Sequence, residues 1–130
     1  MRARSALLAL AACLLVPAPT GLAKVPRVRS VVVDATAYNS LPEQTEGDPW
    51  LSASGHRLEE GMRAIAVSPD LAKLGLVHGR KVRIDGLSGE WIVRDRMPSR
   101  WKRRIDIFMG EDVEAALDFG RRRVRIHWQE

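Results

Sequence analysis

Asp95 and Asp106 stand eleven residues apart in two strand-like segments, and arginines flank both of them. General acid catalysis on a glycosidic oxygen needs a carboxylic acid that stays protonated near neutral pH. Burial or a second carboxylate raises the pKa of such a group, whereas neighbouring arginines lower it. Two aspartates in one cleft can therefore hold one proton between them. Surface ion pairs with Arg94, Arg96 or Arg104 are the alternative, and such pairs stabilise a fold by about 0–1 kcal/mol. The place of Asp106 between two isoleucines is unusual for a surface charge, and both interpretations stay open at this point.

A long polar loop, residues 39–58, follows the first predicted strand. Loops of about 20 residues are unusual in small domains and commonly carry function. This loop supplies hydroxyl and amide groups of the kind that hydrogen-bond to sugars, although ordinary turn chemistry explains the same residue types. The candidate substrate-binding residues in and beside it are Tyr38, Asn39, Gln44, Ser52 and Ser54.

The histidines and the single cysteine argue against other chemistries. His56, His78 and His127 lack the spacing of metal ligands, so no metal and no other cofactor is expected. Ser54 lacks the G-x-S-x-G context of a serine hydrolase. Cys13 is the only cysteine and lies in a segment that we expect to be removed. The remaining chain then has no disulfide and no thiol nucleophile.

Residues 1–23 have the pattern of a secretory signal peptide. Arg2 and Arg4 precede an apolar run of about 12 residues, which is too short for a membrane span of about 20. Helix-breaking prolines follow, and small residues before the end of the segment form a cleavage site. We therefore expect export to the periplasm or the medium, with a folded domain of residues 24–130. Residues 10–13 also match a lipobox, so a lipoprotein anchored through Cys13 is the alternative.

The chain is basic, with a formal net charge of +5, and two runs at 100–104 and 121–123 carry much of this character. Such runs can contact nucleic acid. In an exported protein they favour contact with an anionic cell-wall polymer or with water, so no nucleic-acid partner is expected.

Short β-branched and alternating segments predict about six strands and two short helices. The strands are expected at 30–38, 62–67, 81–85, 90–94, 105–109 and 124–128, and the helices at 68–75 and 111–119. Ser68 and Pro69 are typical of a helix start, and Gly120 of a helix end. Six short strands avoid exposed edges by closing on themselves, which predicts a mainly β fold built on a small barrel.

Several segments, in this order and spacing, resemble the 3D domain, a family named for three aspartates. These segments are 35–39, 52–55, 65–68, 93–97, 104–110 and 119–122. The resemblance runs from about Val33 to Trp128 and implies a six-stranded double-psi β-barrel. The 3D domain occurs in the membrane-bound lytic transglycosylase A and in stationary-phase muralytic proteins.

The resemblance implies cleavage of peptidoglycan glycan strands at the MurNAc–GlcNAc bond without water, giving 1,6-anhydro-muramic ends. It places the general acid at Asp95 and a second site aspartate at Asp106, with Ser52 and Ser54 beside the glycan. Arg96, next to the expected acid, is a further candidate for binding the substrate. The expected partner is the peptidoglycan glycan strand, which a monomer would bind.

The chain departs from the 3D pattern at the first aspartate. The family commonly has Ala-Val-Asp-Pro, whereas residues 66–69 here read Ala-Val-Ser-Pro, and Asp70 follows two places late. Asp70 is therefore a candidate substrate contact in place of that aspartate, or it only caps the short helix. Two other functions stay open: a wall-binding barrel without catalysis, as among the expansins, and a structural module of the cell envelope.

Overall fold

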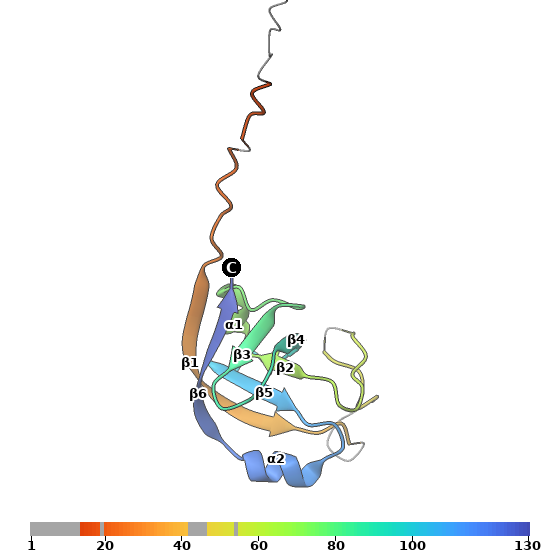
Figure 1. Cartoon of the computed structure of the whole chain (residues 1–130). Coiled ribbons are helices and arrows are strands. Elements are labelled where there is room, and N and C mark those ends of the chain that lie inside the picture. The colour runs from red at the N-terminus through yellow and green to blue at the C-terminus, as the bar shows by residue number, and fades with distance from the viewer. Residues whose placement is uncertain (1–13, 19, 42–46, 54) are drawn as a thin grey trace, which may run out of the picture.

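The computed structural model describes residues 14–18, 20–41, 47–53 and 55–130. The predicted contacts Gln44 and Ser54, and the possible anchor Cys13, lie outside the described residues. Residues 20–27 are exposed and run away from the folded part as an extended segment (Figure 1). The predicted cleavage site lies in this segment, and cleavage there stays a prediction.

The predicted strands and helices are found in the predicted order. They are β1 (Val28–Tyr38), β2 (Ala64–Val67), α1 (Pro69–Lys73), β3 (Lys81–Ile84), β4 (Trp91–Arg96), β5 (Arg104–Phe108), α2 (Val113–Phe119) and β6 (Arg122–Gln129). Boundaries differ from the expected ones by a few residues. The largest difference that affects the site is that β4 continues to Arg96 and so includes Asp95.

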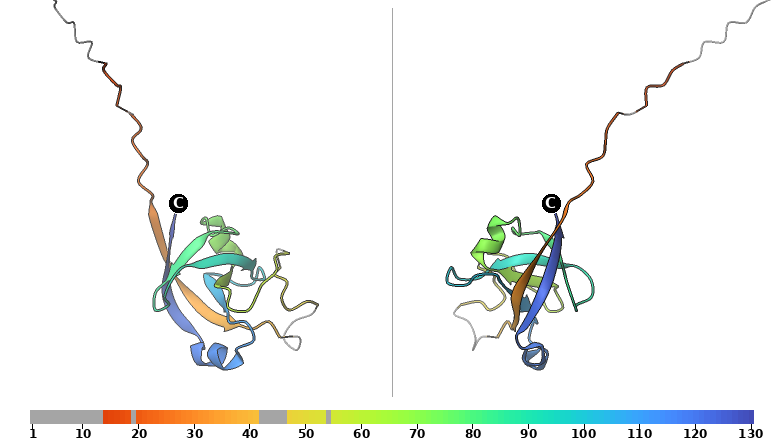
Figure 2. Two further views of the ribbon diagram at one scale, coloured as in Figure 1. Left: turned by 45° about the vertical axis from the view of Figure 1, so that its right-hand side comes forward. Right: turned by 90° about the vertical axis from the view of Figure 1, so that its left-hand side faces the viewer.

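The six strands close into one barrel in the order β1-β5-β2-β4-β3-β6. β1 pairs with β5 and β2 pairs with β4 in parallel, and the other four pairs are antiparallel. β5 lies between β1 and β2, and β4 lies between β2 and β3. In both cases a strand from later in the chain is inserted between two strands that are consecutive in the sequence. This crossed arrangement confirms the predicted fold, a mainly β, six-stranded double-psi barrel with two short helices. The helices lie at opposite ends of the barrel (Figure 2).

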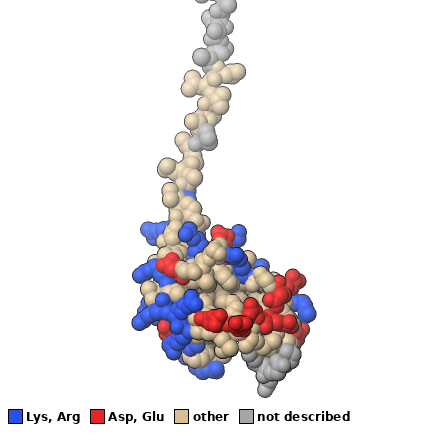
Figure 3. All heavy atoms as spheres, turned by 60° about the horizontal axis from the view of Figure 1, so that its bottom comes forward, with Lys and Arg blue, Asp and Glu red and all other residues tan. Residues whose placement is uncertain are grey.

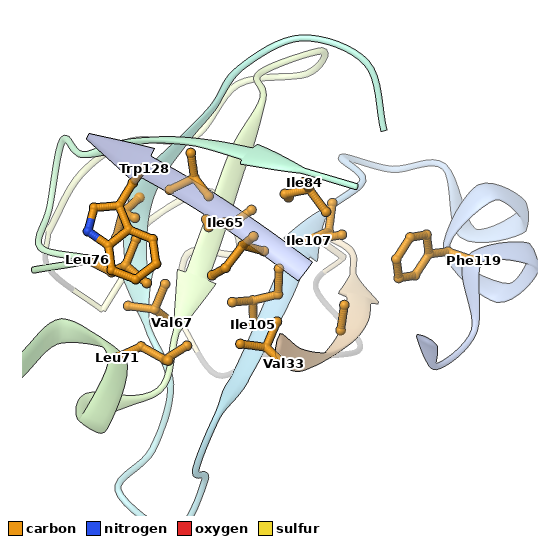
Figure 4. Packing of buried hydrophobic residues seen from close by; sticks show 14 residues of the cluster. Val33, Ile65, Val67, Leu71, Leu76, Ile84, Ile105, Ile107, Phe119 and Trp128 are labelled. Atoms are coloured by element: carbon orange, nitrogen blue, oxygen red, sulfur yellow. The ribbon is translucent and has the colours of Figure 1, made fainter. Parts of the chain in front are cut away.

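Apolar side chains that alternate along the strands fill the inside of the barrel. Ile65, Ile105 and Ile107 are completely buried there. Trp128 of β6 lies at one end of the cluster, and Phe119 of α2 lies at the other (Figure 4). Burying a large apolar side chain stabilises a fold by roughly 1.5–3 kcal/mol, so this cluster is the main support of the strands that carry the site.

Candidate functional site

The outward face of β5 carries three side chains of different character. Ile105 and Ile107 point into the core, and because side chains alternate along a strand, Arg104, Asp106 and Phe108 point outward. A cation, a carboxyl group and an aromatic ring are therefore lined up on the outside of the barrel.

The loop after β1 covers the aromatic end of this face. Phe108 is buried there in a second, smaller cluster with Leu58 and Ala64. The rings of Tyr38 and Trp50 lie 5.5 and 6.0 Å from the Phe108 ring. The loop thus rests on Phe108 and leaves the Asp106 and Arg104 end of the face beside an open groove.

Asp95 and Asp106 lie in one row across neighbouring strands. Ala66 of β2 pairs with Asp95 of β4 on one side and with Asp106 of β5 on the other, and Asp106 pairs in turn with Thr36 of β1. Paired residues point to the same face of a sheet, so the two carboxyl groups lie on either side of the small Ala66 side chain. Two strand spacings place their Cα atoms about 10 Å apart.

A β-bulge in β4 turns Asp95 toward this row. Ile65 pairs with Val93 and the next residue, Ala66, pairs with Asp95, so Arg94 is the extra residue. Val93 points into the core, and strict alternation would have turned Asp95 inward as well. Bulges are frequent beside active sites, where they redirect a side chain.

Asp106 is half-buried and holds a specific hydrogen bond. The Thr36 hydroxyl donates to Asp106 Oδ1 at 3.0 Å, and Arg104 Nη2 donates to Thr36 Oγ1 at 3.3 Å. Burial raises the pKa of Asp106 above its ordinary value, and the charge of Asp95 adds to this effect. The Thr36 hydrogen bond and the Arg104 charge oppose the increase without cancelling it.

Asp95 is held by three donors. The backbone N–H groups of Ala53 and Arg96 donate to Asp95 Oδ1 at 2.7 and 2.8 Å. The Tyr38 hydroxyl donates to Asp95 Oδ2 at 3.4 Å. Burial, with the charges of Asp95 and Asp106, raises the pKa of Tyr38 far above its ordinary value, so this hydroxyl stays a neutral donor. Both carboxyl groups act on the same phenol, which shows that they share one environment.

A groove of about 360 Å³ lies over this row. It is lined by Tyr38, Ala66, Asp95, Arg96, Met97, Pro98, Arg100, Trp101, Arg104 and Asp106. The Arg104 guanidinium stacks on the Trp101 ring at 3.9 Å, and that of Arg100 lies 5.3 Å from the same ring. An indole beside carboxyl groups, a phenol and guanidinium groups suits a sugar chain, because apolar ring faces stack on aromatic side chains while hydroxyl groups take hydrogen bonds.

Of the predicted site residues that are described, Asp95, Asp106, Tyr38 and Arg96 come together in this groove. Asn39 does not line it. Its side chain donates to the carbonyl oxygens of Gly110 and Asp112 at 3.1 and 3.0 Å and so ties the end of β1 to the start of α2.

Ser52 is buried inside the loop that donates to Asp95. Its Oγ accepts from the His56 N–H at 3.1 Å, and its N–H donates to the His56 carbonyl at 2.8 Å. The His56 ring stacks on His78 at 3.8 Å, which joins this loop to the turn before β3. Ser52 therefore supports Ala53, whose N–H reaches Asp95.

Asp70 lies outside the lining of the groove and supports the chain that leads into β5. Its Oδ2 accepts from the Arg103 N–H at 2.9 Å. Burial alone would raise its pKa, but hydrogen bonds from the Ser68 hydroxyl and from backbone N–H groups lower the pKa below its ordinary value. Ser68 stands at the N-cap of α1 without a capping bond, and its Oγ accepts from the Arg104 N–H at 3.1 Å.

The sequence did not predict a role in the site for Thr36, Ala66 or Trp101. It also did not predict that Arg104 donates a hydrogen bond to Thr36. Thr36 and Ala66 carry no signal by themselves, because their role comes from strand register. Trp101 does carry one, since a lone indole lies within a basic run between the two aspartates.

Within the described ranges, no group of three or more His, Cys, Asp or Glu side chains is arranged to hold a metal ion. In the same part of the chain, no helix is long and apolar enough to cross a membrane.

Comparison with solved structures shows a similar fold at low sequence identity. The Streptomyces papain inhibitor is 19% identical, and the match covers 78% of this chain and 94% of that chain with a TM-score of 0.53. No protein-family model and no curated protein matches the chain. At this identity the likeness shows the fold alone.

Proposed function

We propose that this protein is a 3D-domain-like enzyme of the cell envelope that cleaves peptidoglycan glycan strands as a lytic transglycosylase. The observation that carries the proposal is the row in which Asp95 and Asp106 flank Ala66 under one groove. The signal peptide expected at residues 1–23 would export the chain to the compartment that holds this substrate.

The proposed reaction begins with one of the two carboxyl groups protonated. One carboxylic acid protonates the glycosidic oxygen, and the bond from that oxygen to C1 of the muramic acid breaks. The C6 hydroxyl of the same sugar forms a bond to C1 and returns its proton to the carboxylate, so no water is consumed. One acid/base group serves both steps, and a separation set by a nucleophilic water is not required.

The two aspartates differ in how they fit the acid role. The resemblance to the 3D domain assigns the acid to Asp95, which two backbone N–H groups and Tyr38 hold in place. Burial and the neighbouring charge raise the pKa of Asp106 above its ordinary value. We propose that the pair works as a unit, with Asp106 helping to retain the proton and Asp95 positioned against the glycan.

A glycan-binding barrel without catalysis is the second candidate, and one observation favours it. Ser68 replaces the first family aspartate, and Asp70 is engaged with Arg103 outside the groove. Only two of the three family carboxylates therefore meet the substrate groove, and binding without cleavage is compatible with that arrangement.

Digestion of purified peptidoglycan tests the first proposal. Soluble products are read by mass spectrometry for the native protein and for Asp95→Asn and Asp106→Asn. We expect 1,6-anhydro-muropeptides from the native protein and a loss of about 100-fold or more in their rate of release from either variant. Asp118→Asn, which removes an exposed carboxylate of α2, is the matched control and is expected to act as the native protein.

Products with reducing ends would show that the protein hydrolyses the glycan and would contradict this mechanism. Retention of the native protein on peptidoglycan with no soluble product at all would favour the binding barrel.

A further inference from the structure

Three arginines, Arg96, Arg100 and Arg104, line the groove together with the two aspartates Asp95 and Asp106. Arg96 and Arg100 are exposed, and within the described residues neither guanidinium has a hydrogen bond or an ion pair. Arg104 is half-buried, and its Nε is buried without a partner among the described residues. These three arginines, which line the groove with Trp101, are called the arginine cluster below.

The Trp101 ring contacts two of the three arginines of the cluster. Arg104 stacks on the ring at 3.9 Å and Arg100 lies at 5.3 Å from it. A guanidinium that stacks through its face keeps its N–H groups free at the edge, where they donate to an anion with planar oxygens. Stacking also reduces the freedom that each side chain would lose on binding.

The arginine cluster is connected to Asp106 by hydrogen bonds. Arg104 donates to Thr36, and Thr36 donates to Asp106. An anion bound at the cluster would therefore lie on the same side of the barrel as the carboxyl groups and within the same groove.

We propose that the arginine cluster binds a carboxylate of the glycan substrate, so that the groove selects glycan strands that carry carboxylates over neutral ones such as chitin. This inference rests on the proposed function, because it names what the same groove recognises. Peptidoglycan offers such carboxylates in its stem peptides, and in the lactyl group of muramic acid where a stem has been removed. Bidentate arginine contacts with carboxylates are among the stronger hydrogen bonds in proteins.

Retention on insoluble glycans in the cold tests the inference separately from catalysis. The native protein is compared with Arg96→Gln/Arg100→Gln on peptidoglycan, on peptidoglycan whose carboxyl groups have been amidated, and on chitin. Arg123→Gln/Arg125→Gln is the matched control, because it removes the same charge from exposed positions of β6 outside the groove.

We expect the groove variant to bind peptidoglycan about tenfold more weakly than the native protein, while the β6 control binds normally. Amidation should lower binding of the native protein to the level of the groove variant. Chitin should be bound weakly and equally by all three. Equal loss in the two double variants would overturn the proposal, because net charge alone would then explain binding, and so would normal binding by the groove variant.

Two further arms identify the source of the carboxylate and separate the inference from the proposed function. Binding lost after enzymatic removal of the stem peptides assigns the carboxylate to the stems, and binding retained after that treatment shows that the cluster recognises the lactyl carboxylate, which the treatment frees. Retention that depends on carboxylates, without anhydro products, supports the arginine cluster and contradicts the enzyme. If anhydro products form and amidation does not change retention, the enzyme is supported and the arginine cluster is contradicted.

Discussion

The Asp106 carboxylate destabilises the fold at neutral pH. Its pKa in the folded state is raised by burial and by Asp95. A group with a raised folded pKa contributes stability below its unfolded pKa, and that contribution is lost as the pH rises through the folded pKa. At neutral pH the free energy of the charged carboxylate is therefore less favourable in the barrel than in the unfolded chain.

Asp106→Asn should for this reason stabilise the protein at pH 7. The amide oxygen can still accept from Thr36, and no charge has to be buried. We expect the melting temperature to rise by a few degrees, the shift that about 1 kcal/mol produces in a domain of this size. The gain should disappear below about pH 4, where the native carboxyl group is protonated in both states. A variant that melts below the native protein at pH 7 would contradict this account.

The Tyr38→Phe variant tests whether the Tyr38 hydroxyl positions Asp95, while the packing of the ring is kept. The ring packs against Phe108 at 5.5 Å and stays in the variant, whereas the hydroxyl that donates to Asp95 is lost. We expect a change of about 1 kcal/mol or less in the free energy of unfolding in urea. The rate of anhydro-muropeptide release should fall about ten- to a hundredfold, because a small misplacement of a reacting group costs that much. An unchanged rate would mean that the Ala53 and Arg96 N–H groups position Asp95 alone.

At the scale of the elements, Asp70 fixes the entry to β5. Arg103 has a positive φ of 46°, a left-handed conformation that costs energy in residues other than glycine. Its N–H donates to Asp70, and its carbonyl accepts from the Asp34 N–H at 2.9 Å. α1 thus holds the bend from which Arg104 and Asp106 follow.

Asp70→Ala should lower the free energy of unfolding by about 1 kcal/mol, while Asp70→Asn, which keeps an acceptor, should lower it less. The folded pKa of Asp70 is lowered, so its contribution is present above the unfolded pKa and is lost as the pH falls through the folded pKa. The difference between native protein and Asp70→Ala in urea unfolding should therefore shrink below about pH 4. Retention on peptidoglycan should not change, and a selective loss of retention in a stably folded variant would restore Asp70 as a substrate contact.

The elements could be predicted because their signals are local. β-branched runs mark β1 and β2, and Pro69 and Gly120 mark a helix start and a helix end. The relative placement of Asp95 and Asp106 could not be predicted in the same way. It depends on the extra residue Arg94 in β4 and on the insertion of β5 between β1 and β2, and both are decided by pairing between distant strands. The Trp101 stack depends in turn on where those strands put Arg104.

At the scale of the whole molecule, one face of the protein carries most of its acidic side chains in one region and most of its basic side chains in another, with a few of each sign among the other (Figure 3). The exposed arginines of β6 belong to a different part of the barrel from the groove, since none of them lines it. This separation allows a charge to be removed from one basic region without touching the other.

The barrel is closed by its first and last strands, which makes its stability depend on the far end of the chain. β1 and β6 pair from Val28 with Gln129 to Ala35 with Arg122. Trp128 is 3% exposed in the core, and Arg29 of β1 lies 5.5 Å from its ring. A chain in which such distant segments must meet folds slowly, and a defect in that closure affects every strand.

Trp128→Ala should therefore lower the free energy of unfolding by about 3–5 kcal/mol, a large part of the stability of a small domain. Trp128→Phe is the matched control and should lose much less, because the indole Nε1 is buried without a partner among the described residues and its removal breaks no hydrogen bond. Circular dichroism in urea measures both variants without relying on tryptophan fluorescence. If the barrel is one cooperative unit, the Trp128→Ala transition stays single and moves to lower urea. A second transition, with the groove side still folded, would show instead that β1 and β6 open independently of the strands that carry Asp95 and Asp106.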